Sequence, residues 1–215
     1  NHNKGHSGRM TALITLPEEL AGEREAISLL CRCDGVVIHL RRDNPEPLAR
    51  TVWELCGGDE RLLGRFTLHH APALSERYGF GGTHRRFSER NGECHGRLSV
   101  SCHSFDEVRT VLDEGQADSM FLSPVFDSHS KKGYMSAFGH RELERFLGSL
   151  SDEERRKVVA LGGVDADNMA LCRNMGFGGA AMIGSLWAVS DGAIDPEATL
   201  SNYMTLENIW LTKTR

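Results

Sequence analysis

Residues 157–187 read KVVALGGVDADNMALCRNMGFGGAAMIGSLW, and this stretch decides the fold class. Residues 157–164 form a short apolar run that includes two glycines near its end, which is typical of a buried parallel strand. Residues 168–177 have the apolar spacing of a helix, and residues 178–187 form a second apolar run. A strand, a helix and a further strand in so short a stretch predict a βαβ unit with parallel strands.

The same alternation of strand-like and helix-like patterns extends through the rest of the chain. Six strand-like runs precede the opening stretch, at residues 11–16, 35–41, 65–70, 81–87, 96–103 and 119–126. Helical patterns follow most of these runs, Ser104 and Glu107 have the spacing of a capping box, and a last helix is expected within 195–212. Eight such units predict a single α/β domain, a (β/α)8 barrel of the TIM type. The alternative, an open doubly wound sheet, requires a glycine-rich first turn, which residues 14–20 (ITLPEEL) lack.

Composition limits the classes of partner. The formal net charge of −5 is small, so nucleic acid is not expected as a partner. No apolar run reaches the roughly 20 residues that cross a bilayer, so a membrane is not expected either. The six cysteines are scattered and predict reduced thiols in a cytoplasmic protein. Residues 1–9 have no apolar core, and we interpret them as an expression leader in front of one barrel domain, residues 10–215.

Histidine gathers at the predicted carboxyl ends of the strands, where barrels of this type place their chemistry. The strand-end residues that could bind or react are His39, Arg41, His69, His70, His84, Ser101 and His103. Neutral imidazoles are good zinc ligands, so a zinc hydrolase built on the histidines at 39, 69, 70 and 84 is one hypothesis. The lack of a carboxylate on the same strands disfavours it.

Two glycine-containing turns predict a phosphate site. Gly162 and Gly163 follow one strand, and Ile183 and Gly184 end the next. Barrels frequently bind phosphate after their last two strands, and glycine lets backbone N–H groups approach an anion closely.

The loop after residues 119–126 adds polar groups on the neighbouring strand. Ser128 and Ser130 offer rotatable hydroxyl donors, and Lys131 offers a point charge. Because this strand adjoins the one that ends at Gly162, these side chains are expected over the same mouth of the barrel. Their chemistry suits a phosphate or a pyrophosphate.

Four motifs resemble those of the thiamine phosphate synthase/TenI family: LSVSCHS (98–104), FLSPVFDSHSKKGY (121–134), VVALGGV (158–164) and GGAAMIGSLW (178–187). Their order and spacing agree with that family from about Gly35 to Trp187, whereas residues 42–95 match it poorly. The resemblance implies a thiamine-biosynthesis enzyme with a TIM-barrel fold. In the synthase branch it is a transferase that joins hydroxymethylpyrimidine pyrophosphate to hydroxyethylthiazole phosphate, releases pyrophosphate and uses Mg2+.

The resemblance also implies roles for individual residues. The catalytic residues expected from it are Lys131 and Arg41, which would stabilise pyrophosphate, and His103. The expected substrate- and phosphate-binding residues are His39, Ser101, Ser128, Ser130, Gly162, Gly163, Ile183 and Gly184. A homodimer is a further expectation, because dimers are common in the family.

The chain departs from the synthase branch at two strand ends. Where the synthase has Gln-x-Arg-x-Lys, this chain has His39, Arg41 and Asp43. Where the synthase has an Asn-Asp pair that contributes to magnesium binding, this chain has His69-His70. Magnesium prefers carboxylates to imidazoles, so we expect no metal unless Glu89 or Asp127 takes over that role.

The TenI branch accommodates these departures. Its members resemble the synthase but aromatise a thiazole carboxylate phosphate, a proton relocation that requires neither pyrophosphate nor a cofactor. A histidine in their Ser-Val-His-Ser motif acts as acid and base, and His103 stands at that position. The first hypothesis is therefore a TenI-like tautomerase, with a magnesium-dependent synthase as the alternative. A barrel that binds thiamine phosphates without catalysis is a third hypothesis, from another class.

Overall fold

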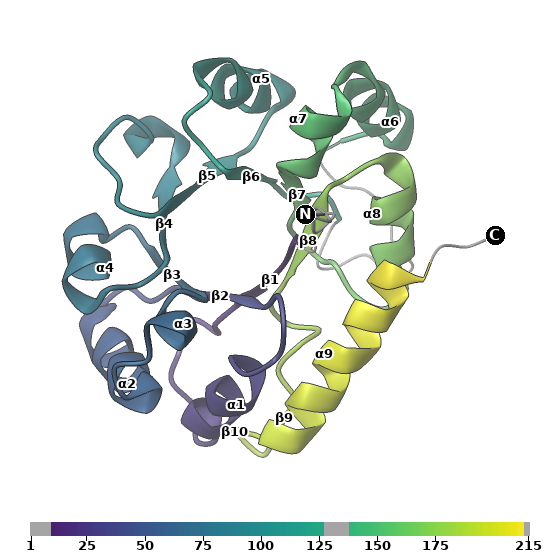
Figure 1. Ribbon diagram of the computed structural model, residues 1–215. Coiled ribbons are helices and arrows are strands. Elements are labelled where there is room, and N and C mark those ends of the chain that lie inside the picture. The colour runs from purple at the N-terminus through teal and green to yellow at the C-terminus, as the bar shows by residue number, and fades with distance from the viewer. Residues whose placement is uncertain (1–9, 127–137, 213–215) are drawn as a thin grey trace, which may run out of the picture.

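The computed structural model describes residues 10–126 and 138–212, which form a closed barrel of eight parallel strands in sequence order (Figure 1). This confirms the predicted (β/α)8 barrel. The strands are β1 Met10–Ile14, β2 Val37–Leu40, β3 Phe66–His69, β4 Gly82–Arg86, β5 Arg97–Cys102, β6 Ser119–Leu122, β7 Val158–Ala160 and β8 Gly179–Met182.

Helices surround this barrel on the outside (Figure 1). They are α1 Glu23–Leu30, α2 Glu46–Cys56, α3 Glu60–Leu63, α4 Pro72–Tyr78, α5 Phe105–Glu114, α6 His140–Ser149, α7 Asp152–Arg156, α8 Met169–Met175 and α9 Pro196–Leu211. Between β4 and β5 only the 3-10 turn η1 Phe87–Glu89 is present, and a short hairpin, β9 Val189–Ser190 with β10 Ala193–Ile194, precedes α9. None of the described helices is long and apolar enough to cross a membrane.

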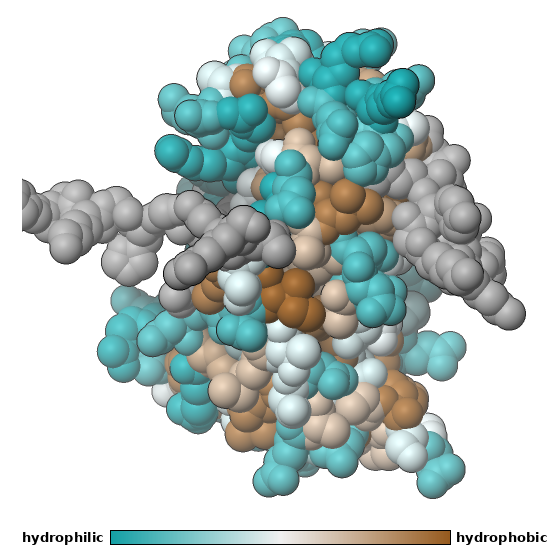
Figure 2. Space-filling view, turned by 90° about the vertical axis from the view of Figure 1, so that its right-hand side faces the viewer, coloured by the Kyte–Doolittle hydropathy of each residue, from teal (hydrophilic) through white to brown (hydrophobic). Residues whose placement is uncertain are grey.

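Apolar side chains on both elements fill the space between strands and helices. Ile38 and Phe66 on neighbouring strands are completely buried there, as is Ile27 on α1. Figure 2 shows the side of the molecule that carries α8 in Figure 1, where apolar side chains form small groups between hydrophilic ones. The helices therefore turn their apolar stripes toward the barrel, as their 3.6-residue periodicity predicts.

The interior of the barrel is divided into an apolar and a polar sector. Ala12, Ile14, Phe121, Val159 and Ala181 form a buried apolar cluster there. The strand register continues this inward-facing set into β2–β5, because Ile14 pairs with His39, His39 with Thr67, His69 with His84, and His84 with Ser99. In the polar sector the positions that point inward therefore carry imidazoles and hydroxyls.

The double glycine after β7 is required by the approach of the segment that leaves β6. The Val125 N–H donates to Leu161 O at 2.9 Å, and the Phe126 N–H donates to Gly162 O at 3.0 Å. Gly162 has φ 103°, and a Cβ there would lie 2.9 Å from Pro124 Cα. Gly163 has φ 64°, and its Cβ would lie 3.0 Å from Phe126 Cβ. Both the backbone conformation and the lack of space favour glycine.

We predict that Gly162→Ala lowers the free energy of unfolding by about 1–3 kcal/mol, because alanine is strained at this φ and contacts Pro124. Gly148→Ala is the matched control, since a Cβ on this α6 glycine meets no atom within 4 Å and should be neutral or stabilising. Denaturant unfolding of both variants checks this. Equal stabilities would contradict the packing role given to Gly162.

Candidate active site at the carboxyl ends of the strands

A cavity of about 390 Å³ opens at the carboxyl ends of the first strands, and we call it the mouth pocket. Its lining includes Thr15, Arg41, Arg42, Asp43, His69, His70, Arg86 and Ile183. Its volume is in the range of small-molecule sites. Ile183 comes from the end of β8, so the mouth pocket reaches the turn in which the sequence predicts phosphate binding.

The three arginines of the mouth pocket differ in their availability to a ligand. Arg42 is engaged by the buried carboxylate of Glu23 and donates to Leu16 O at 2.8 Å. Arg86 is paired at 3.5 Å with Glu89, and both side chains are exposed, so this pair is weak. Arg41 forms no ion pair with any residue in 10–126 or 138–212. Arg41 and Arg86 therefore give the mouth pocket a positive charge that suits an anionic ligand.

The described residues of the mouth pocket do not fit magnesium. Asp43 is the one carboxylate among its described lining residues. Glu89 lies on the exposed turn η1 beside Arg86, and Asp127 lies outside the described residues. Imidazoles at positions 69 and 70 are poor ligands for this hard cation, which prefers oxygen. Whether the protein uses magnesium therefore stays a prediction.

His70 is held in an unusual backbone conformation at the edge of the mouth pocket. Its φ is 59°, in the left-handed region, and its N–H donates to His84 O at 2.9 Å. Its Nδ1 is buried without a hydrogen-bond partner among the described residues. Burial lowers the pKa of His70, and the neighbouring Arg86 lowers it further. A strained residue with an unsatisfied polar atom at a pocket is typical of a functional position.

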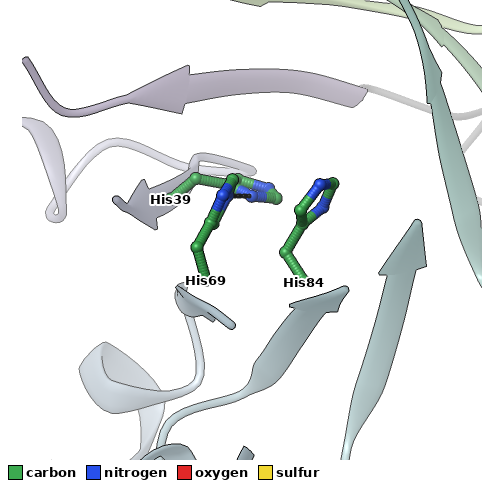
Figure 3. A group of neighbouring side chains, drawn as sticks. All are labelled: His39, His69 and His84. Atoms are coloured by element: carbon green, nitrogen blue, oxygen red, sulfur yellow. Dashed lines mark hydrogen bonds between the residues drawn. The ribbon is translucent and has the colours of Figure 1, made fainter. Parts of the chain in front are cut away.

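Beneath the mouth pocket three imidazoles converge in the polar sector, and we call them the buried histidine trio: His39, His69 and His84 (Figure 3). His39 Nδ1 lies 2.9 Å from His69 Nε2, and the rings of His69 and His84 stack at 4.1 Å between centroids. His69 also lines the mouth pocket, whereas His39 lines a deeper cavity of about 50 Å³. The trio therefore separates two cavities along the barrel axis.

Both ring nitrogens of His84 are hydrogen-bonded to hydroxyl groups of β5. Nδ1 lies 2.7 Å from Ser99 Oγ, and Nε2 lies 2.6 Å from Ser101 Oγ. Ser101, predicted to line the substrate pocket, thus contacts the buried histidine trio. A hydroxyl can donate or accept, so the serines are compatible with either neutral tautomer of His84.

Burial keeps the three imidazoles uncharged. It lowers the pKa of His39 from 6.5 to about 3, with a contribution from Arg97. Burial also holds the pKa values of His69 and His84 well below the usual range, and the neighbouring imidazoles add to this. The cause is the cost of charging a group out of contact with water. At neutral pH each ring therefore has one lone pair free to accept a hydrogen bond or a metal ion.

His103 lies on the rim of the barrel, after β5. Its Nδ1 donates to the carbonyl oxygen of Ser123 at 3.1 Å, and its backbone N–H donates to Glu107 Oε2 at 2.6 Å. The ring is exposed. A proton on Nδ1 leaves Nε2 as the acceptor in the neutral ring, which is the form that a general base requires. Ser104 caps α5 as predicted, but Glu107 bonds His103 instead of closing the capping box.

The turns after β7 and β8 are joined to each other. Ser185 Oγ donates to Val164 O at 2.8 Å. Within the part of the chain that the structure describes, the N–H groups of Gly163 and Gly184 have no hydrogen-bond acceptor. They are thus available to a ligand such as phosphate, and phosphate binding at these turns stays a prediction. Ser128, Ser130 and Lys131 lie outside the described residues.

The family comparison agrees with the motifs at these strand ends. Residues 89–186 match the family model described as thiamine monophosphate synthase. A thiamine-phosphate synthase of Syntrophomonas wolfei is 30% identical over 192 residues, which cover 89% of this chain and 66% of that protein. The chain is therefore similar to members of the thiamine monophosphate synthase (TMP-TENI) family.

Further relatives of this family match parts of the chain or its fold. A thiamine-phosphate synthase of Limosilactobacillus reuteri is 32% identical over 94 residues, or 44% of this chain and 42% of that protein. A thiamine phosphate pyrophosphorylase from Bacteroides thetaiotaomicron superposes with a TM-score of 0.78 at 23% identity, covering 95% of this chain and 99% of that one. One from Pyrococcus furiosus has a TM-score of 0.63 at 18% identity, over 93% and 96% of the two chains. The matched part of this chain spans just under two thirds of the first relative's length and less than half of the second's.

We predict that acidification lowers the free energy of unfolding, because the imidazoles of the buried histidine trio are protonated more readily in the unfolded chain than in the folded protein. Below pH 6.5 the unfolded chain protonates its imidazoles, whereas folded His39 takes a proton only near 3. Between these values His39 alone makes the free energy of unfolding fall by about 1.4 kcal/mol per pH unit. His39→Asn should remove that share of the slope, because it keeps a nitrogen donor near Nδ1 but does not titrate.

Urea unfolding at a series of pH values, in the presence of a chelator, measures this slope. His95→Asn is the control, since His95 is exposed and paired with Glu76 at 3.3 Å on the surface. An unchanged slope in His39→Asn would show that His39 is not held neutral by burial.

Proposed function

We propose that this chain is an enzyme of thiamine biosynthesis that binds a thiazole phosphate at the barrel mouth and tautomerises it, in the manner of the TenI branch. The choice of reaction rests on one observation. His69 and His70 stand at the end of β3, where the magnesium-dependent synthase reaction would need a carboxylate. Aromatising a thiazole carboxylate phosphate relocates a proton and needs no metal to hold pyrophosphate. The described site is suited to that reaction.

His103 would carry the proton. Its Nδ1–H is fixed on the carbonyl of Ser123, so Nε2 can remove a proton from the thiazole ring system and then return it at another atom. The ring is exposed to solvent on the rim of the barrel. Atoms and charge balance, since only the position of one proton and of the double bonds changes.

The two anionic groups of the substrate have separate partners in this arrangement. The backbone N–H groups of Gly163 and Gly184 would hold the phosphate. The carboxylate would lie against Arg41 and Arg86, which both line the mouth pocket. Ile183 lines that pocket beside the β8 turn, which connects the two binding regions.

The second candidate function is thiamine phosphate synthase. The names of the curated relatives favour it, and the guanidinium groups of Arg41 and Arg86 also suit a pyrophosphate. On this alternative, magnesium would need carboxylates beyond those of the described pocket lining. The two reactions use different substrates, so they can be separated in one assay.

We predict that the purified protein aromatises the thiazole carboxylate phosphate and that His103→Ala lowers kcat by about 10²–10⁴-fold, the usual contribution of a general acid–base. Ultraviolet absorbance of the thiazole follows the reaction. His95→Ala, which removes an exposed imidazole elsewhere, should retain full activity. Full activity in His103→Ala would contradict the mechanism. Formation of thiamine phosphate and pyrophosphate from the two phosphorylated halves with magnesium would establish the synthase instead.

We predict that Arg41→Gln weakens binding of the thiazole carboxylate phosphate by about 10-fold or more, the loss expected for one charge-assisted hydrogen bond. Binding of hydroxyethylthiazole phosphate, which lacks the carboxylate, should change little. Isothermal titration with both ligands measures this difference. Arg50→Gln is the control, since Arg50 is exposed on α2 and paired with Glu46 at 3.5 Å. Equal losses for both ligands would assign Arg41 to the phosphate instead.

A further inference from the structure

We propose that His39, His69 and His84 bind a transition-metal ion of the Zn2+ type inside the barrel, beneath the mouth pocket (Figure 3). The site is distinct from any magnesium site, and the inference does not depend on the reaction proposed above. It rests on the positions of the three side chains, the chemistry of their donor atoms and the residues that hold them.

The three imidazoles come from adjacent strands, and their rings point toward one another (Figure 3). One nitrogen of each lies within 4.8 Å of the others, and the His39–His69 pair is already at 2.9 Å. Nitrogens around a tetrahedral zinc ion, at about 2.1 Å from the metal, lie about 3.4 Å apart.

The donor chemistry selects the class of metal. Imidazole nitrogen suits Zn2+, Co2+, Ni2+ and Cu2+, whereas Mg2+ and Ca2+ prefer oxygen.

Two serines supply the outer contacts that metal-binding histidines usually have. His84 is bonded through one nitrogen to Ser99 and through the other to Ser101. Whichever nitrogen turns to the metal, the opposite one keeps a hydroxyl partner that fixes the ring.

The polar sector differs from the rest of the barrel interior. The opposite sector is filled by apolar residues, Ala12, Ile14, Phe121, Val159 and Ala181. In the polar sector, hydrogen bonds join His39 to His69 and His84 to two serines. A bound metal ion would replace some of these bonds and give one nitrogen of each ring a common partner.

The coordination set is open. No carboxylate or thiol of the described residues joins the three imidazoles. Structural zinc sites use four protein ligands, whereas sites with three keep a position for water or substrate. Because His69 lines the mouth pocket, that position is reached from the pocket, and a ligand group bound there can meet the metal.

The test uses the full chain, stripped with a chelator and titrated with Zn2+ against a chromophoric competitor. Substituting His2 and His6 by Asn removes the two imidazoles within residues 1–9, which could also bind metal. We expect about one equivalent of Zn2+, and about one equivalent of Co2+ with the visible bands of a four-coordinate ion. The control variants His95→Asn and His140→Asn should bind Zn2+ as tightly as the protein without them, since both rings are exposed and paired with glutamates.

Loss of a ligand should weaken binding more than loss of an outer contact. His39→Asn and His84→Asn should bind Zn2+ at least about 100-fold more weakly, whereas Ser99→Ala or Ser101→Ala should lose about 10–100-fold, and only one of the two serines should matter. That serine holds the nitrogen of His84 that faces away from the metal. Zn2+ should also raise the melting temperature of the protein with intact ligands, and not that of the His39 variant.

Binding well below one equivalent, or binding that His39→Asn and His84→Asn leave unchanged, would overturn the proposal. If those variants do not fold, X-ray absorption spectroscopy of the Co2+-loaded protein with all three histidines intact identifies the atoms bound to the metal. Three imidazole nitrogens on the metal support the site, and an all-oxygen shell overturns it.

Discussion

The parallel register of β1–β5 is the constraint on which the rest of this structure depends. It pairs Ile14 with His39, and His69 with His84, so residues far apart in sequence face the same interior. A shift by one residue would turn these imidazoles toward the helices and place apolar side chains inside. The polar sector, the mouth pocket above it and the buried histidine trio all follow from this pairing.

The mouth of the barrel combines two kinds of anion site. The turns after β7 and β8 offer backbone N–H groups, and their glycines also let the segment after β6 approach within hydrogen-bonding distance. The ends of β2 and β4 offer guanidinium groups on Arg41 and Arg86. A ligand with anionic groups at both ends suits this separation, whereas a magnesium–pyrophosphate complex is usually held by more carboxylates than Asp43, the one in the described lining.

Local patterns in the sequence were sufficient for the fold. Apolar runs alternating with helical spacing predicted all eight strands, including the weak one at 81–87, and the helix at 195–212. They also placed His103, Gly163 and Gly184 at strand ends, because such positions depend on neighbouring residues in the chain. The sequence-based zinc hypothesis grouped His39, His69 and His84 together with His70, but it could not predict which three converge inside the barrel. Whether a strand-end histidine faces the mouth or the interior depends on inter-strand register, and His39 was also expected among the substrate-binding residues.

The central claim is that this pocket binds a phosphorylated thiazole without magnesium. The most direct measurement is the affinity of the thiazole carboxylate phosphate for the purified chain, determined by calorimetry with and without added magnesium. The account predicts the same affinity under both conditions, because Arg41 and the backbone of Gly163 and Gly184 hold the anionic groups. Binding that is measurable only when magnesium is present would contradict it.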